Sequence, residues 1–121
     1  PGGVRIGTAE IYRIVESMDD VADSLVVGQN WKNDVKIILF VVLKNDVKLN
    51  DDLIEKIKTK IRTNATPRHI PALIHQITEV PHTISGKKVE LAVTKILNGE
   101  TVDNKEALAN PESLDQFHKF L

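Results

Sequence analysis

Apolar residues recur every three to four positions in three segments of the chain, a spacing that places them on one face of a helix. The segments are residues 8–18, 51–62 and 89–98. Asn50 is a favourable N-cap for the second segment, which is acidic at its start and basic at its end, as helices favour. The predicted buried faces are, in order, Ile11, Ile14, Val15 and Met18; Leu53, Ile54, Ile57 and Ile61; and Val89, Ala92, Val93, Ile96 and Leu97.

Three other segments are rich in β-branched residues, which predicts strands. Residues 24–28 and 35–43 flank a polar connector, residues 29–34, whose length suits two antiparallel strands. Residues 72–80 alternate apolar and polar side chains over part of their length, as a half-buried strand does. We therefore expect a hairpin and one further strand.

The remaining segments complete the predicted order of elements. Residues 63–71 contain two prolines and are expected to be irregular. Asn110-Pro111 predicts a cap and first turn for a short C-terminal helix, whose apolar side is Leu114, Phe117 and Leu121. The order α-β-β-α-β-α-α predicts an α+β fold with a small, mainly antiparallel sheet, formed by the hairpin and the further strand and packed with helices.

Length and composition limit the classes of function. The 121 residues suffice for a single domain, residues 1–121, with its own core. The balance of 16 Lys and Arg against 17 Asp and Glu argues against nucleic acid as a partner. The chain has no cysteine, which fits the cytoplasm, and its four histidines lack the spacing of a metal site, so we expect none. No apolar run reaches the roughly 20 residues that a membrane-spanning helix needs, so we expect no membrane partner.

The segment from Val80 to Glu90 sets a lysine in a tight turn between the predicted third strand and third helix. Pro81 and Gly86 favour irregular backbone on the two sides of this turn. Lys87 follows the glycine directly, so we expect it to be exposed and able to reach a partner surface. Lys88, at the start of the helix, is expected to be an ordinary solvated charge.

A second glycine-rich segment opens the chain. Gly2 and Gly7 have the spacing of a phosphate-binding P-loop, but that motif needs a lysine after the second glycine, and Thr8 follows Gly7 directly. We therefore reject a P-loop. The residues alone leave two interpretations of Gly2, Gly3 and Arg5 open: a functional loop, or a linker remnant with a solvated arginine. The abrupt start also leads us to expect that the chain is a piece of a longer protein.

Both segments resemble motifs of the adenylate-forming superfamily, which includes acyl-CoA synthetases, adenylation domains of peptide synthetases and luciferases. The segment that opens the C-terminal domain of that superfamily resembles residues 3–11, GVRIGTAEI. The lysine motif of the same domain looks like residues 81–87, PHTISGK. The two motifs occur in the right order and at about the right separation, and the resemblance extends over essentially the whole chain.

Within the superfamily, residues 7–11 are similar to the short-chain synthetases for acetate and acetoacetate. Residues 86–90 and the tail, residues 107–115, look most like the members that act on acetoacetate. Acetate enzymes usually continue the lysine motif with a more arginine-rich run, which this sequence lacks. The resemblance therefore favours acetoacetate as the acid.

The resemblance implies a two-step ligase. This domain would swing against its partner, a larger N-terminal domain of the same protein that binds ATP with Mg²⁺ and a small carboxylic acid. In the first step the carboxylate attacks the α-phosphorus of ATP and pyrophosphate leaves. In the second step, after the domain has rotated, CoA attacks the acyl-adenylate and forms the thioester.

The motif match assigns the expected site residues. Lys87 would be catalytic in the first step, where its ammonium stabilises charge that is redistributed among the phosphate oxygens. Gly2 and Gly3 would let the pantetheine arm of CoA pass close to the backbone, and Arg5 would face the nucleotide phosphate. Arg62 matches the position where related short-chain synthetases hold the CoA 3'-phosphate. Alternatively, Arg62 is only a favourable positive charge at the end of a helix.

A rival function of a different class also remains open. The chain could be a stand-alone α+β module whose turn at residues 85–88 grips an anion or a partner protein. The two functions differ in what must precede the chain, because a ligase requires a large domain with its own glycine-rich ATP loop and a module does not.

Overall fold

The computed structural model describes residues 8–31, 34–44, 47–65, 70–102 and 105–120. The elements are α1 (Thr8–Glu16), β1 (Val21–Trp31), β2 (Asp34–Leu43), α2 (Asp51–Asn64), β3 (Leu73–Gln76), α3 (Glu90–Leu97) and the 3-10 helices η2 (Lys105–Ala107) and η3 (Pro111–Phe120). This order confirms the predicted α+β class. No helix in the described part of the chain is long and apolar enough to cross a membrane.

The predicted hairpin is confirmed, but its strands are longer than expected. β1 pairs with β2 in antiparallel register from Val21 opposite Leu43 to Trp31 opposite Asp34. Most of the polar residues that were expected to form a connector therefore belong to the strands. The reason is that strand pairing uses backbone groups, so a ladder continues through polar positions until a tight turn closes it.

The third strand is shorter than the predicted residues 72–80, and it pairs in parallel. β3 lies beside β2, with Leu73 opposite Ile38 and Gln76 opposite Val41, which gives the strand order β1-β2-β3. A last backbone hydrogen bond joins the N–H of Ile77 to the carbonyl of Val41 at 2.9 Å. Beyond that point the alternation of buried and exposed residues reflects packing on the core without a neighbouring strand.

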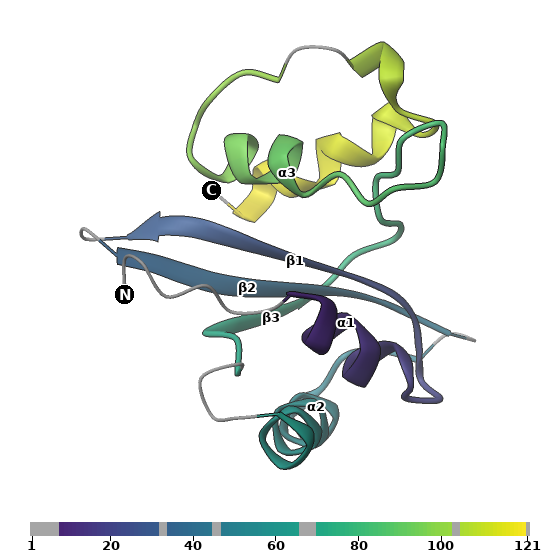
Figure 1. Cartoon of the computed structure of the whole chain (residues 1–121), viewed down its shortest axis with the longest axis vertical. Coiled ribbons are helices and arrows are strands. Elements are labelled where there is room, and N and C mark those ends of the chain that lie inside the picture. The colour runs from purple at the N-terminus through teal and green to yellow at the C-terminus, as the bar shows by residue number, and fades with distance from the viewer. Residues whose placement is uncertain (1–7, 32–33, 45–46, 66–69, 103–104, 121) are drawn as a thin grey trace.

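Helices cover both faces of the sheet, as Figure 1 shows: α1 and α2 pack on one face, α3 and η3 on the other. Successive residues of a strand point to opposite faces. Leu25 and Phe40 accordingly belong to the core on the α3 side, and Val26 and Leu39 to the core on the α1 side. All four are buried, and each such side chain contributes about 1.5–3 kcal/mol to stability.

The helices largely have the predicted faces and ends. The apolar residues predicted for α1 are buried, as are Leu53, Ile57 and Ile61 of α2. Asn50 caps α2, because its side-chain Oδ1 accepts a hydrogen bond from the N–H of Leu53 at 2.8 Å. α3 ends before Gly99, whose φ of 78° is the left-handed conformation that glycine adopts readily.

The C-terminal helix forms where expected, but as the 3-10 helix η3. Its Leu114 and Phe117 are buried against α3 and the sheet, whereas Leu121 lies outside the described residues. The side chain of Asn110 does not serve as the predicted cap, because both ends of its amide bind the chain near residue 81, as described below.

Candidate functional site

The predicted lysine turn is a closed loop, residues 82–88, which we call the lysine loop. At its stems, His82 and Lys88 form an isolated antiparallel bridge. At its tip, the N–H of Gly86 donates to the carbonyl of Thr83 at 2.9 Å. The φ of Gly86 is 93°, a conformation that residues with a Cβ rarely adopt, which explains a glycine at this position.

The backbone of Lys87 is held on both sides by one residue. Thr83 donates its N–H to the carbonyl of Lys87 at 2.8 Å, and its Oγ1 accepts the N–H of Lys87 at 3.0 Å. The side chain of Lys87 is exposed, and no residue in the described ranges forms an ion pair with its ammonium. The expected exposure of Lys87 is thus confirmed, and its charge is available to an anion.

The C-terminal tail supports the lysine loop from outside. The N–H of Ile84 donates to the carbonyl of Ala107 at 3.0 Å, and the N–H of Ala109 donates to that of His82 at 2.9 Å. Asn110 accepts the N–H of His82 at 2.9 Å with Oδ1 and donates through Nδ2 to the carbonyl of Val80 at 3.0 Å. The loop therefore rests on residues that lie more than twenty positions further along the chain.

Lys88 is not the solvated charge that was expected. Its Nζ donates to Asp23 Oδ1 at 2.7 Å, to Glu16 Oε2 at 2.9 Å and to the carbonyl of Ser24 at 2.7 Å. It also lies 4.6 Å from the centroid of the Tyr12 ring, a cation–π distance. Burial alone would lower the pKa of Lys88, but the hydrogen bonds and charges of the two carboxylates outweigh it and raise that pKa.

A tyrosine joins the same group of polar side chains to α3. The hydroxyl of Tyr12 donates to a carboxylate oxygen of Glu90, and it accepts the N–H of Val26 at 3.0 Å. Burial, reinforced by the hydrogen bond to Glu90, raises the pKa of Tyr12 far above its usual range. Tyr12, Glu16 and Asp23 were not predicted as site residues, and no local pattern in the sequence indicates that they meet Lys88.

The other predicted site residues are not gathered around Lys87. Arg62 is exposed in the last turn of α2, on the face of the sheet opposite α3, so the structure does not bring it to the lysine loop. Gly2, Gly3 and Arg5 lie outside the described residues. In the described part of the chain, no three His, Cys, Asp or Glu side chains gather in a way that could hold a metal ion.

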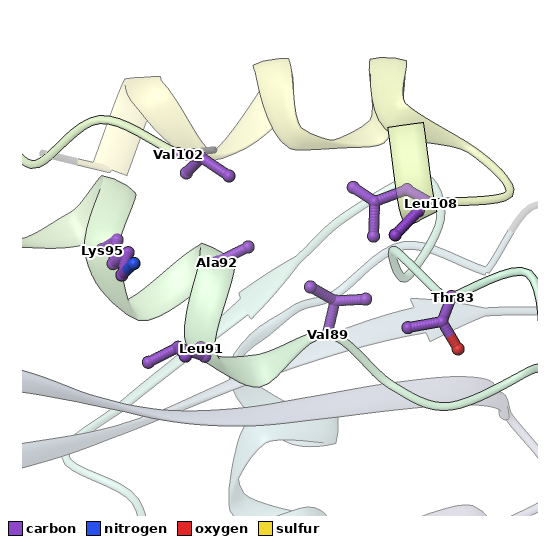
Figure 2. Close-up of a pocket in the computed structure, with 8 residues that line it drawn as sticks. Thr83, Val89, Leu91, Ala92, Lys95, Val102 and Leu108 are labelled. Atoms are coloured by element: carbon purple, nitrogen blue, oxygen red, sulfur yellow. The ribbon is translucent and has the colours of Figure 1, made fainter. Parts of the chain in front are cut away.

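A largely apolar pocket of about 270 Å³ lies beside the lysine loop (Figure 2). It opens between α3 and the segment that leads to η2, and its lining is Thr83, Val89, Leu91, Ala92, Lys95, Val102, Ala107 and Leu108. Neither Lys87 nor Arg62 lines it. The predicted chemistry is therefore not inside this pocket but on the exposed loop next to it.

The fold and the lysine loop define a class of protein, and comparison with known families agrees. Residues 10–87 match the family of AMP-binding enzyme C-terminal domains, and the chain belongs to that family. The predicted resemblance to the C-terminal domain of adenylate-forming enzymes is thereby confirmed.

Individual relatives narrow the comparison. The chain is 56% identical over 117 residues to an acetoacetyl-coenzyme A synthetase of Rhizobium meliloti (strain 1021), covering 97% of this chain and 18% of that protein. It is 44% identical over 118 residues to an acetoacetyl-CoA synthetase of Xenopus tropicalis, with the same two coverages of 97% and 18%. The solved structure of acetoacetyl-CoA synthetase from Streptomyces lividans has a TM-score of 0.88 at 34% identity, over 98% of this chain and 18% of that one. The chain thus spans less than a fifth of the length of these relatives.

Proposed function

We propose that this chain is the mobile C-terminal domain of an AMP-forming acid–CoA ligase that converts acetoacetate, ATP and CoA into acetoacetyl-CoA, AMP and pyrophosphate. The observation that carries the proposal is Lys87, an exposed ammonium on a loop whose tip is fixed by Thr83 and Gly86. The acid is inferred from the two curated relatives, both named for acetoacetyl-CoA. The family match argues against the stand-alone module as an alternative.

In the first step, an oxygen of the acid's carboxylate attacks the α-phosphorus of ATP. The bond from that phosphorus to the bridging oxygen breaks, and pyrophosphate leaves with the electron pair. Lys87 places a compact positive charge beside the phosphate oxygens while the charge shifts among them, which lowers the barrier. Mg²⁺, the acid and most of ATP bind to the larger N-terminal domain, the partner of this chain in the proposal.

In the second step, the thiolate of CoA attacks the carbonyl carbon of the acyl-adenylate and AMP leaves. We propose that Gly2 and Gly3 give the pantetheine arm room along the backbone and that Arg5 faces the nucleotide phosphate. Arg62 is proposed to bind the CoA 3'-phosphate, a role that its exposure permits. Because Arg62 and Lys87 lie on different layers of the domain, serving both steps requires the domain to rotate between them. The proposed location, the cytoplasm, rests on the absence of cysteine.

The test uses the full-length protein that contains this chain. Acid-dependent exchange of labelled pyrophosphate into ATP should be fastest with acetoacetate among small carboxylic acids. Lys87→Ala should slow this exchange by roughly 10²- to 10³-fold, the usual effect of removing one preorganised charge from a transition state. The same variant should still convert supplied acyl-adenylate and CoA into product at the normal rate.

A matched control is Lys56→Ala, which removes an exposed lysine of α2 on the other face of the sheet. It should leave both half-reactions unchanged. An unchanged exchange rate in Lys87→Ala would show that the lysine loop does not serve adenylation. Faster exchange with another acid would overturn acetoacetate alone.

A further inference from the structure

One carboxylate grips both stems of the lysine loop. Asp23 accepts a hydrogen bond from Lys88 Nζ on Oδ1 at 2.7 Å, and its Oδ2 lies 3.5 Å from His82 Nε2. His82 and Lys88 are the two residues of the bridge that closes the loop. Lys87 is therefore carried by a loop that is fastened to β1 at both of its ends.

The ammonium of Lys88 is fully used in this attachment. A lysine has three N–H donors, and those of Lys88 reach Asp23, Glu16 and the carbonyl of Ser24. Glu16 is itself held, because it accepts the hydroxyl of Ser24 at 2.6 Å. Only 22% of the Lys88 side chain is exposed, so little of it remains to meet a ligand. We call Glu16, Asp23, His82 and Lys88 the stem clamp.

A bulge in β1 sets the direction of Asp23. Val21 pairs with Leu43 but Asp23 pairs with Val42, so Ala22 is an extra residue in the strand. In a regular strand Val21, Asp23 and Leu25 would point to the same face. Here Val21 is buried on the α1 side while Leu25 is buried on the α3 side. The bulge thus lets Asp23 turn toward the lysine loop without exposing Val21, a recognised use of bulges near active sites.

We propose that the stem clamp positions Lys87, with Asp23 and Lys88 as positioning residues that fix the loop without meeting the substrate. The proposal rests on the proposed function of Lys87. The lysine side chain is a flexible four-carbon stem, so the accuracy with which its ammonium is placed depends on how firmly its backbone is held. Misplacing a catalytic group by about 1 Å can cost on the order of 10²-fold in rate.

The clamp should matter for one half-reaction only. In the proposed mechanism Lys87 acts in adenylation and is remote from the reacting atoms during thioester formation. A residue that acts through Lys87 inherits this asymmetry. A residue that only holds the domain together would affect both half-reactions in proportion to the amount of folded protein.

The test uses the full-length protein with two substitutions. Lys88→Met keeps the length of the side chain and removes its charge, and Asp23→Asn keeps the size of the side chain and removes its charge. Each should slow pyrophosphate exchange by roughly 10- to 10²-fold, the cost of a displaced catalytic group. Each should leave thioester formation from supplied acyl-adenylate unchanged. Lys88→Arg should recover most of the loss, and Lys56→Met is the matched control without effect.

A double variant separates positioning from any independent role. If Lys88 acts only through Lys87, then Lys87→Ala combined with Lys88→Met should be no slower in adenylation than Lys87→Ala alone. Multiplied losses, or equal losses in both half-reactions, would overturn the positioning role. Should Lys88→Met fail to fold, Asp23→Asn with Lys87→Ala provides the same cycle.

The outcomes also distinguish this inference from the proposed function. Normal adenylation in Lys87→Ala would contradict the proposed function itself. Slow adenylation in Lys87→Ala together with normal adenylation in both Lys88→Met and Asp23→Asn would overturn the clamp alone.

Discussion

The tip and the stems of the lysine loop differ sharply in their surroundings although they are neighbours in sequence. Ile84, Ser85, Gly86 and Lys87 are exposed, and Ile84 keeps 75% of its surface accessible. One residue further on, Lys88 donates three hydrogen bonds to groups from α1 and β1. Two adjacent lysines thus have opposite environments.

The contrast indicates a division of work between the two lysines. A charge that must pair with a phosphate cannot already be paired within the protein, which suits the exposed Lys87. A charge that already has its partners can hold a loop but has nothing left for a ligand, which suits Lys88. Because both are lysines, the difference between them comes from their positions in the loop and not from their chemistry.

The largest effect should follow from changing the backbone at the tip. Gly86→Val places a Cβ where φ is 93°, with no atom within 4 Å to clash, so the cost comes from the backbone conformation alone. That conformation costs roughly 1–2 kcal/mol for residues with a Cβ. The loop should therefore shift, and adenylation should slow by about tenfold, which corresponds to 1.4 kcal/mol.

Gly99→Val is the matched control for this prediction. Gly99 also has a positive φ, 78°, and a Cβ there would likewise meet no atom within 4 Å. It follows α3, away from the tip, so the variant should lose similar stability in thermal unfolding and keep its rate of adenylation per folded molecule. Equal slowing in both variants would show that the tip is not special.

The next effect concerns the stems at alkaline pH. The pKa values of Tyr12 and Lys88 are both raised in the folded state, so the folded chain binds these protons more tightly than the unfolded chain. Their contribution to stability is complete below about pH 10 and is lost as the pH rises above it. Chemical denaturation of the chain between pH 8 and 12 should show this decline.

Tyr12→Phe identifies the source of that decline. The variant loses the hydrogen bonds of Tyr12 to Glu90 and Val26, which should lower the free energy of unfolding at pH 8 by about 1 kcal/mol or somewhat more. Its decline above pH 10 should be shallower than that of the parent chain. A parallel decline in both chains would mean that Tyr12 titrates alike in the folded and unfolded states.

The smallest effect should come from a histidine far from the lysine loop. His75 of β3 stacks on Phe120 with ring centroids 4.4 Å apart and lies 5.8 Å from Phe40. Burial, together with the charges of Lys119 and Lys36, lowers its pKa. The folded chain therefore binds this proton less readily, and stability should fall as the pH drops below about 6.5.

His75→Phe should remove this acid sensitivity and keep the aromatic stack. Thermal unfolding at pH 5 and pH 8 is the measurement. A variant whose melting temperature still falls between pH 8 and pH 5 as much as that of the parent chain would exclude His75 as the cause.

The sequence predicted the elements well where burial follows a simple period. The faces of α1 and α2 were correct because their apolar residues keep helical spacing and Asn50 marks the start of α2. The ends of the strands were less accurate. Residues 77–80 keep the alternation of a strand but have no neighbouring strand, and alternation alone cannot distinguish pairing from packing.

The candidate site was predicted at its tip and missed at its stems. Lys87 follows from local signals, since Gly86 and the turn are contiguous with it. The environment of Lys88 depends on partners that lie far away in sequence: Glu16 is 72 residues distant and Asp23 is 65. Nothing near Lys88 in the sequence distinguishes a clamped lysine from a solvated one, so this prediction was wrong.

The tail that supports the lysine loop bears on where this domain can be cut. The family match ends at residue 87, yet Ala107, Ala109 and Asn110 hold the loop through backbone and side-chain bonds, and η3 completes the core beneath α3. A chain trimmed at the family boundary would keep Lys87 but lose the scaffold behind it. The recognisable motif is therefore smaller than the unit that makes it work, and transplanting the loop into another protein would have to bring the tail along.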